Sequence, residues 1–217
     1  NRYKDSLFLR QPCKELSIRQ IQSRAFETLA RKMIYTVQLP SVNGVGLAGP
    51  QAGISKRLFV VIADDDIRRV FINPQIISTS SNMTDYEEGC LSIPGVYEVI
   101  KRPEKVTVQA FNENGKPFTL EADGLLARII QHENDHLDGF LFIDRGDKDF
   151  AQKIVDKFNK KAEKAEAKRL EKEFNWTEKQ AMARINESAA NRKGFHKSFF
   201  NIDNEDSSHY MLTINTG

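Results

Sequence analysis

The feature that most constrains this chain is His132-Glu133-Asn134-Asp135-His136, an HExxH pattern inside a segment with helical periodicity. Two histidines four residues apart lie on one face of a helix, so both imidazoles can bind one cation. The glutamate between them points away from that cation but can still take a proton from a water molecule on it. Alternatively, both rings simply pack on the core. Catalytic sites of this kind use three protein ligands, so the third ligand decides the type of site.

Several residues are candidates for the third ligand. The metzincin pattern would place a third histidine where this chain has Phe142, which cannot bind a metal. Cys90 lies in the segment EEGCLS, beside a glycine that lets backbone approach closely. It could instead be a buried structural thiol, or a nucleophile activated by a histidine. Residues without a supporting motif are Glu163, Glu166, His196 and His209.

A third cluster is the glycine-rich loop Gly44–Gln51, with the sequence GVGLAGPQ. It lacks the Gly-Lys-Ser/Thr ending of a phosphate-binding loop and precedes a predicted strand, which excludes that function. Its small residues would let a substrate backbone lie against the chain as an added strand. The amide of Gln51 could stabilise a developing oxyanion. A flexible turn remains the alternative.

The apolar pattern of the first 140 residues combines helices with antiparallel strands. Residues 17–37, with Ser17 as N-cap and an apolar residue at every fourth position, predict one helix. The region 58–79 reads as strands broken at 64–66 and at Asn73–Pro74. Predicted strands 105–112 and 117–122 flank Asn114–Gly115, a strong hairpin signal. The predicted sheet is antiparallel and meandering.

The HExxH helix is predicted to begin after Asp123 and end near Asp138, followed by a short strand at 140–143. A long charged helix is then expected over 148–174. Only alanines continue its apolar stripe beyond residue 162, which predicts that its second half projects into solvent. Thr177 and Gln180 form a capping-box pattern before a further helix to about residue 190.

Composition limits the class of protein. With 40% hydrophobic and 29% charged residues, the chain is globular, and its longest apolar run is too short to cross a bilayer. Two cysteines cannot form a disulfide framework. Residues 148–217 carry 14 Lys and Arg against 11 Asp and Glu, within an overall net charge of +2. This weakly basic tail could bind an acidic partner such as ribosomal RNA, although a solvated helix would look the same.

In their order and spacing, GVGLAGPQ, EGCLS and QHENDH resemble the three signature motifs of the peptide deformylase family, over about residues 5–165. The resemblance implies that Cys90, His132 and His136 hold a metal and that Glu133 is the general acid/base. It also implies that Gln51 and the backbone N–H of Leu91 bind the oxygen of the formyl group. The implied activity is removal of the formyl group from the N-terminal methionine of nascent polypeptides, with release of formate.

For the substrate, we expect backbone pairing by Gly44, Val45, Gly46 and Gly89. Leu125 and Ile129 precede His132 on its helix face and could line a slot for the methionine side chain, or could be plain core residues. Tyr86 is expected to wall the entrance. The thiolate and two imidazoles suit Fe²⁺, Zn²⁺, Ni²⁺ or Co²⁺, and the resemblance favours Fe²⁺.

The combined prediction is an α+β fold with antiparallel meandering sheets around a central HExxH-bearing helix, followed by a long C-terminal helix. Residues 1–165 would form the catalytic domain and 166–217 a charged helical extension. In the family, a helix after the core can dock near the ribosomal exit, so the basic helix 148–173 is a candidate ribosome contact. No membrane partner is expected. The expected location is the cytoplasm, bacterial or phage-encoded, or an organelle if a targeting peptide has been removed. The alternative function is an inactive, ribosome-associated relative.

Overall fold

The computed structural model describes residues 8–42, 44–63 and 67–187. The chain separates into two compact units, one formed by residues 8–147 and the other containing the described residues 148–187. The predicted α+β class is confirmed by the larger unit, which combines antiparallel sheets with helices. The predicted domain boundary at residue 165 stays a prediction, because these units describe packing and not function.

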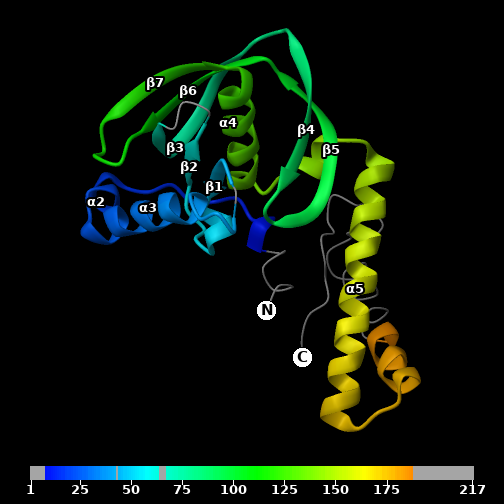
Figure 1. The fold of residues 1–217 in the computed structure, drawn as a ribbon. Coiled ribbons are helices and arrows are strands. Elements are labelled where there is room, and N and C mark those ends of the chain that lie inside the picture. The colour runs from blue at the N-terminus through cyan, green and yellow to red at the C-terminus, as the bar shows by residue number, and fades with distance from the viewer. Residues whose placement is uncertain (1–7, 43, 64–66, 188–217) are drawn as a thin grey trace, which may run out of the picture. The chain divides into compact units, whose positions relative to one another are not determined.

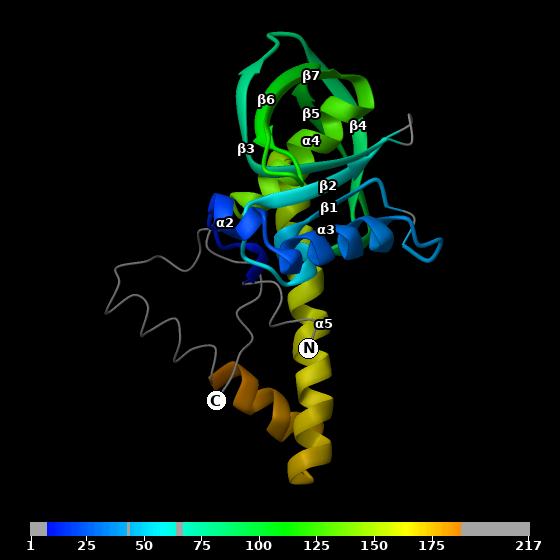
Figure 2. The same cartoon turned by 90° about the vertical axis from the view of Figure 1, so that its left-hand side faces the viewer.

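The larger unit is built on a five-stranded antiparallel sheet in the order β1-β2-β3-β6-β7. The strands are β1 (Gly46–Ala48), β2 (Leu58–Ile62), β3 (Arg68–Thr79), β6 (Lys105–Phe111) and β7 (Pro117–Asp123). β2 is apolar throughout because both faces of the sheet are covered (Figures 1 and 2). Leu58 and Val60 pack with α3 (Arg24–Val37), whereas Phe59 and Val61 pack with α4 (Gly124–Leu137).

A second, two-stranded sheet consists of β4 (Met83–Cys90) and β5 (Ile93–Pro103). The HExxH helix α4 lies between this sheet and the five-stranded sheet (Figure 1). The predicted hairpin is confirmed, since β6 and β7 pair from Lys105↔Asp123 to Phe111↔Pro117. The motif helix is therefore central, as the sequence predicts.

The predicted helix over residues 17–37 is wrong in one respect, because it is two helices. α2 (Ile18–Ile21) is capped by Ser17, and Ser23 caps α3 separately by accepting the N–H of Phe26. The buried face of α3 consists of Phe26, Ala30, Met33 and Val37.

Two predicted strand limits are also wrong. Asn73–Pro74 does not break β3 but lies at a register shift in its pairing with β6. Asn73 adopts a positive φ of 49°. Its side-chain amide accepts the N–H of Leu16 at 2.9 Å and donates to the carbonyl oxygen of Leu16 at 2.8 Å. Residues 140–143 form no strand, because Asp144 accepts the N–H of Leu141 and starts the 3₁₀ turn η2 (Phe142–Arg145).

The second unit contains α5 (Lys148–Phe174), with the predicted bounds, and a further helical segment over 178–187. The second half of α5 does not project freely, because Ala167 and Leu170 pack against Ala181 and Ile185. The predicted capping box is confirmed: Thr177 Oγ1 accepts the N–H of Gln180, whose side chain accepts the N–H of Thr177. The predicted end of this helix near residue 190 lies outside the described residues. Among those described, no helix is both long and apolar enough to span a bilayer.

Candidate metal centre

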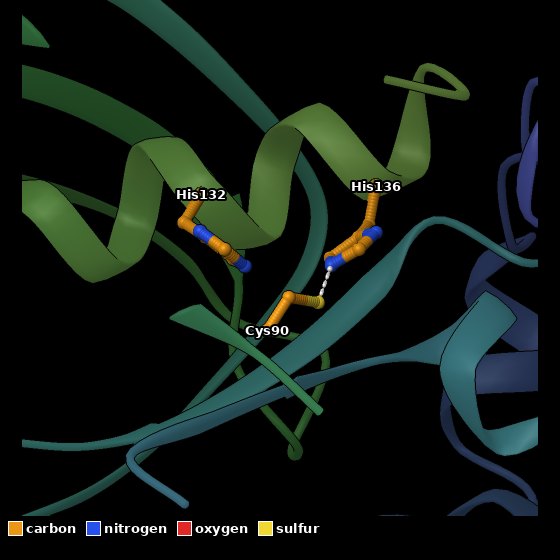
Figure 3. A group of neighbouring side chains, drawn as sticks. All are labelled: Cys90, His132 and His136. Carbon is orange, nitrogen blue, oxygen red and sulfur yellow. Dashed lines mark hydrogen bonds between the residues drawn. The ribbon is translucent and has the colours of Figure 1, made fainter. Parts of the chain in front are cut away.

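Cys90, His132 and His136 converge at one point between β4 and α4 (Figure 3). Their donor atoms all lie within 4.8 Å of one another, and Cys90 Sγ is 3.3 Å from His136 Nε2. His136 is completely buried, and the side chain of His132 is only 11% exposed. Of the candidates for the third ligand that lie within the described residues, Cys90 is therefore the one that the fold brings to the two imidazoles.

Local periodicity explains this convergence. Residues two apart on a strand point to the same face, so Cys90 shares the inward face of β4 with buried Glu88. His132 and His136 are one helical turn apart and share the face of α4 that meets this strand (Figure 3). The pairing of β4 with β5 shifts register between Gly89 and Cys90, and the packing of β4 against α4 brings the Cys90 sulfur to the two rings.

The electrostatic environment of Cys90 favours the thiolate, the form of cysteine that binds metals. Burial alone would raise the pKa of the Cys90 thiol, but the charges and hydrogen bonds of His136 and His132 outweigh burial and hold this pKa well below its usual value. The N–H of Ser92 and the amide of Gln51 also point at the sulfur, at 3.4 and 3.5 Å. A thiolate beside two imidazoles is the donor set that binds zinc or iron(II), so these residues fit a divalent cation.

Glu133 is buried beside this donor set. A Cβ added to Gly46 would lie 2.5 Å from Glu133 Oε1, so the carboxylate rests directly against the backbone of β1. Its other oxygen, Oε2, is buried without a hydrogen-bond partner within the described part of the chain. Burial raises the pKa of Glu133, although His132 and His136 oppose this effect. A carboxylate with a free oxygen and a raised pKa is suited to proton transfer.

Gln51 is fixed in orientation by its neighbours. Its Oε1 accepts the N–H of Ala48 at 2.7 Å, which leaves its NH₂ group to donate toward Cys90 and Ser92. Gln51 lies in the 3₁₀ turn η1 (Gly49–Ala52), which follows β1 directly. The glycine-rich loop is therefore a structured part of the site and not a flexible turn.

The predicted substrate residues lie around this centre, and their role stays a prediction. Leu91 is 44% exposed, and its side chain lies 3.2 Å from the point that a Cβ added to Gly44 would occupy. Tyr86 is half exposed, with the guanidinium of Arg128 5.8 Å from its ring centre. Leu125 and Ile129 pack with the main core, which agrees with the alternative that they are ordinary core residues. The remaining predicted positions are Val45, exposed on the loop, Gly46 in β1 and Gly89 in β4.

The rejected ligand candidates have other surroundings. The ring of Phe142 stacks on the ring of His132, with 6.0 Å between the ring centres, so Phe142 packs beside the site and offers no donor atom to a metal. Glu163 and Glu166 belong to α5, in the second unit. His196 and His209 lie outside the described residues.

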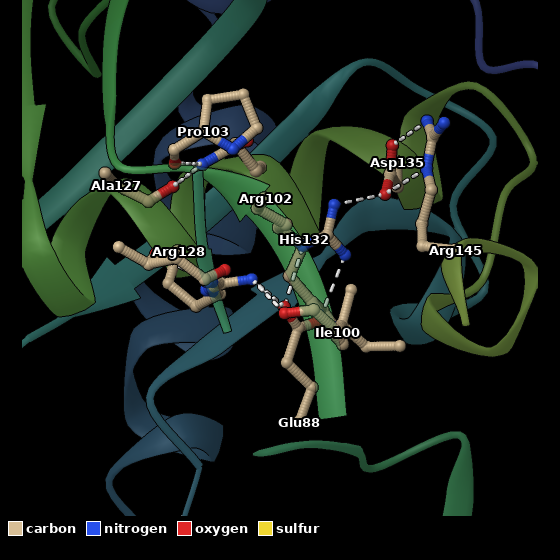
Figure 4. A network of polar contacts seen from close by, with 11 residues as sticks. Glu88, Ile100, Arg102, Pro103, Ala127, Arg128, His132, Asp135 and Arg145 are labelled. Carbon is tan, nitrogen blue, oxygen red and sulfur yellow. Dashed lines mark hydrogen bonds and ion pairs between the residues drawn. The ribbon is translucent and has the colours of Figure 1, made fainter. Parts of the chain in front are cut away.

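Sequence reasoning missed a buried ionic network behind the histidines (Figure 4). Glu88 contacts His132 Nδ1 at 2.9 Å and forms ion pairs with Arg102 and Arg128. Burial alone would raise the pKa of Glu88, but hydrogen bonds from His132 and Arg102 lower it to about 2. Arg102 also pairs with Asp135, inside the HExxH motif. The available signal was Glu88 itself, an unexpected carboxylate two residues before Cys90.

The same partners act on His132. Burial alone would lower the pKa of its imidazole, but hydrogen bonds with Cys90 and Glu88 raise it to about 10. His132 therefore lies between two anionic groups, the thiolate in front and the carboxylate behind.

An HExxH helix packed against a cysteine-bearing strand defines a metal-dependent hydrolase. Comparison with known proteins narrows this class: a family model described as polypeptide deformylase matches residues 2–151. The chain belongs to the polypeptide deformylase family.

Individual relatives agree with this assignment. The chain is 49% identical over 144 residues to peptide deformylase 1 of Clostridium perfringens, covering 66% of this chain and 94% of the relative. It is 57% identical over 105 residues to a peptide deformylase of Treponema pallidum, covering 48% of this chain but only 64% of that relative.

Solved structures share the fold. A peptide deformylase from Synechococcus elongatus in complex with actinonin superposes with a TM-score of 0.62 at 46% identity, covering 69% of this chain and 82% of that one. A class I type b peptide deformylase from Acinetobacter baumannii, solved with Met-Ala-Ser bound, gives a TM-score of 0.60 at 35% identity, covering 64% and 91%.

Proposed function

We propose that this chain removes the formyl group from the N-terminal formylmethionine of nascent polypeptides and releases formate. The observation that carries the proposal is the convergence of Cys90, His132 and His136 beside the buried carboxylate of Glu133. The Acinetobacter relative with bound Met-Ala-Ser supports a peptide that begins with methionine. The matched relatives from Clostridium and Treponema are bacterial, which supports action in the compartment where bacterial ribosomes work.

Different residues would bind the cation, transfer the proton and stabilise the negative oxygen. Cys90, His132 and His136 would hold the cation, which when bound supplies Lewis acidity toward water and a carbonyl oxygen. Glu133 takes the proton of the attacking water and delivers it to the departing amine nitrogen. The NH₂ group of Gln51 and the backbone N–H of Leu91 donate to the oxygen that becomes negative. The orientation of Gln51 by Ala48 supports this role, since it turns the donor and not the carbonyl toward the site.

Iron(II) is the proposed working cation, with zinc, nickel and cobalt as alternatives that the same donors accept. The test is formate release from formyl-Met-Ala-Ser by protein loaded anaerobically with each metal. We expect the fastest release of formate from the iron form. This form should lose activity in air as the thiolate oxidises. Equal rates for iron and zinc would refute the metal preference. No release with any of the four metals would refute the activity and favour the inactive binding module.

Gly46→Ala tests the position of Glu133. Because the added methyl group would collide with Glu133 Oε1, the carboxylate must move, and a displacement near 1 Å at a reacting group lowers the rate by about 10²-fold. The measurement is formate release together with metal content. Metal content should stay unchanged because Gly46 is not one of the three residues whose donor atoms converge. Activity equal to that of the wild type would show that Glu133 does not need this position.

A ribosomal contact through α5 is the second part of the proposal. Seven exposed lysines, most of them three or four residues apart, fall within an arc of about 120° on this helix. They are Lys153, Lys157, Lys160, Lys161, Lys164, Lys168 and Lys172. Ala167 and Leu170, which pack within the second unit, lie outside this arc. Within the described part of the second unit these lysines are exposed, as contact with a polyanion such as ribosomal RNA requires.

Replacing Lys160, Lys161 and Lys164 together by glutamine tests the lysine stripe. If each lysine contacts one phosphate, the slope of log affinity against log salt should fall by about three. The measurement is co-sedimentation with ribosomes across a salt series. The matched control replaces Lys32, Lys105 and Lys116, which are exposed on the larger unit, and should bind as the wild type does. An equal loss in both triple variants, or no binding by the wild type at low salt, contradicts the proposal.

A further inference from the structure

Two aromatic side chains lie at the turn between α5 and the helical segment 178–187 (Figure 1). Phe174, the last residue of α5, is 51% exposed, and its ring stacks on the ring of Trp176 with 5.1 Å between the ring centres. Trp176 is held in place because it also packs against the small core of the second unit, to which Phe174 does not belong. The packing of this core therefore does not account for Phe174, an exposed ring stacked on a fixed neighbour.

A groove lies beside Trp176, along the helical segment that follows it. Its lining residues are Trp176, Gln180, Ala183, Arg184 and Glu187, and its volume of about 590 Å³ is typical of a site for a small ligand. The capping box uses the carbonyl oxygen of Gln180, which accepts the N–H and the hydroxyl of Thr177 at 2.9 Å each, so the NH₂ group of Gln180 is left to donate. The groove thus combines an aromatic ring with an amide donor, which suits a flat group that carries acceptor atoms on its edge.

The exposed lysines of α5 lead directly to these two rings. Lys168 and Lys172 precede Phe174 by about 9 and 3 Å along the helix axis. Residues 166–187 themselves carry five basic and five acidic side chains, so this end of the unit has no excess charge of its own to attract an anion. The lysines therefore supply attraction for a polyanion and the rings supply flat surfaces, and a nucleic acid with unpaired bases matches both.

We propose that Phe174 and Trp176 form a stacking platform for unpaired bases of the RNA that the α5 lysines bind, with one base on the exposed ring of Phe174 and one in the groove beside Trp176. The inference rests on the ribosomal contact proposed above and deepens it by naming unpaired nucleotides as the ligand. Single-stranded RNA is recognised by stacking its bases on aromatic side chains, whereas the salt dependence of binding comes from contacts to phosphates. The platform should therefore add affinity that salt does not weaken.

Trp176 is the single tryptophan of the chain, so its fluorescence reports the platform directly, because a base stacked on an indole ring quenches its emission. The wild type is titrated with a short end-labelled oligouridylate, whose anisotropy reports binding, and separately with inorganic polyphosphate, which has charge but no bases. We expect quenching by the RNA and none by the polyphosphate. RNA that binds without quenching, or equal quenching by both probes, would overturn the platform alone. If neither probe bound at low salt, the platform and the lysine contact would both be refuted.

Phe174→Ala is the matched variant, and Phe140→Ala is its control, since Phe140 is 45% exposed on the larger unit. Loss of one stacking ring should weaken RNA binding by about 5–150-fold without changing the slope of log affinity against log salt, because no charge is removed. Polyphosphate binding by Phe174→Ala, and both affinities of Phe140→Ala, should match the wild type. Unchanged RNA affinity, or an equal loss for RNA and polyphosphate, would overturn the proposal. Helix content is checked by circular dichroism, and if Phe174→Ala did not fold, the quenching of the wild type would still decide.

Discussion

Glu133→Gln is expected to lower formate release by about 10²–10⁴-fold while the metal content of the protein stays unchanged. Glutamine has nearly the same shape as glutamate but cannot take up a proton. Glu133 is buried, and one of its oxygens has no hydrogen-bond partner among the described residues, so this oxygen is free to accept a proton. The measurement is the steady-state rate on formyl-Met-Ala-Ser beside metal analysis of the same sample.

The unchanged metal content is the control that gives this experiment its meaning. A variant that lost both activity and metal would indicate that Glu133 supports the site structurally. A variant that kept both would contradict the general-acid/base role and would favour a different proton acceptor. Loss of activity alone separates an enzyme from an inactive relative, since a binding module has no rate to lose.

Cys90→Ala is expected to weaken metal binding by about 10²–10³-fold. Structural zinc sites with four ligands bind with a free energy of about 10–16 kcal/mol, so an equal share for each ligand is about 2.5–4 kcal/mol. Cys90 contributes a thiolate, because the two histidines hold its pKa low. Formate release should fall in parallel with metal content, and the measurement is metal affinity by chelator competition.

The other cysteine supplies a matched control. Cys13 is buried in the main core and is absent from the cluster of donor atoms, so Cys13→Ala removes a thiol of equal size without touching the site. We expect this variant to bind metal like the wild type, with a modest loss of stability from the small cavity. Equal metal loss in both variants would show that the effect comes from the fold and not from ligation.

Most of the fold could be predicted where one local signal decided the structure. The Asn114–Gly115 turn set the hairpin of β6 and β7, and the capping residues of α5's neighbour, Thr177 and Gln180, marked a helix start. Predictions were wrong where a second interaction competed with the local pattern. The apolar spacing predicted one helix over residues 17–37, but Ser23 caps a second helix within that range. The apolar residues 140–143 predicted a strand, but Asp144 accepts the N–H of Leu141 and a 3₁₀ turn forms there.

The candidate site divides in the same way. By itself, the sequence determined the pair of imidazoles, since spacing on a helix places His132 and His136 on one face whatever surrounds them. It also supplied the motifs that identify Cys90 and Glu133. Only the tertiary structure decided that Cys90 meets those rings, and that Glu88, Arg102 and Asp135 stand behind them. The physical reason is that these contacts join separate elements, and charged side chains are buried together only after packing has brought opposite charges within hydrogen-bonding distance.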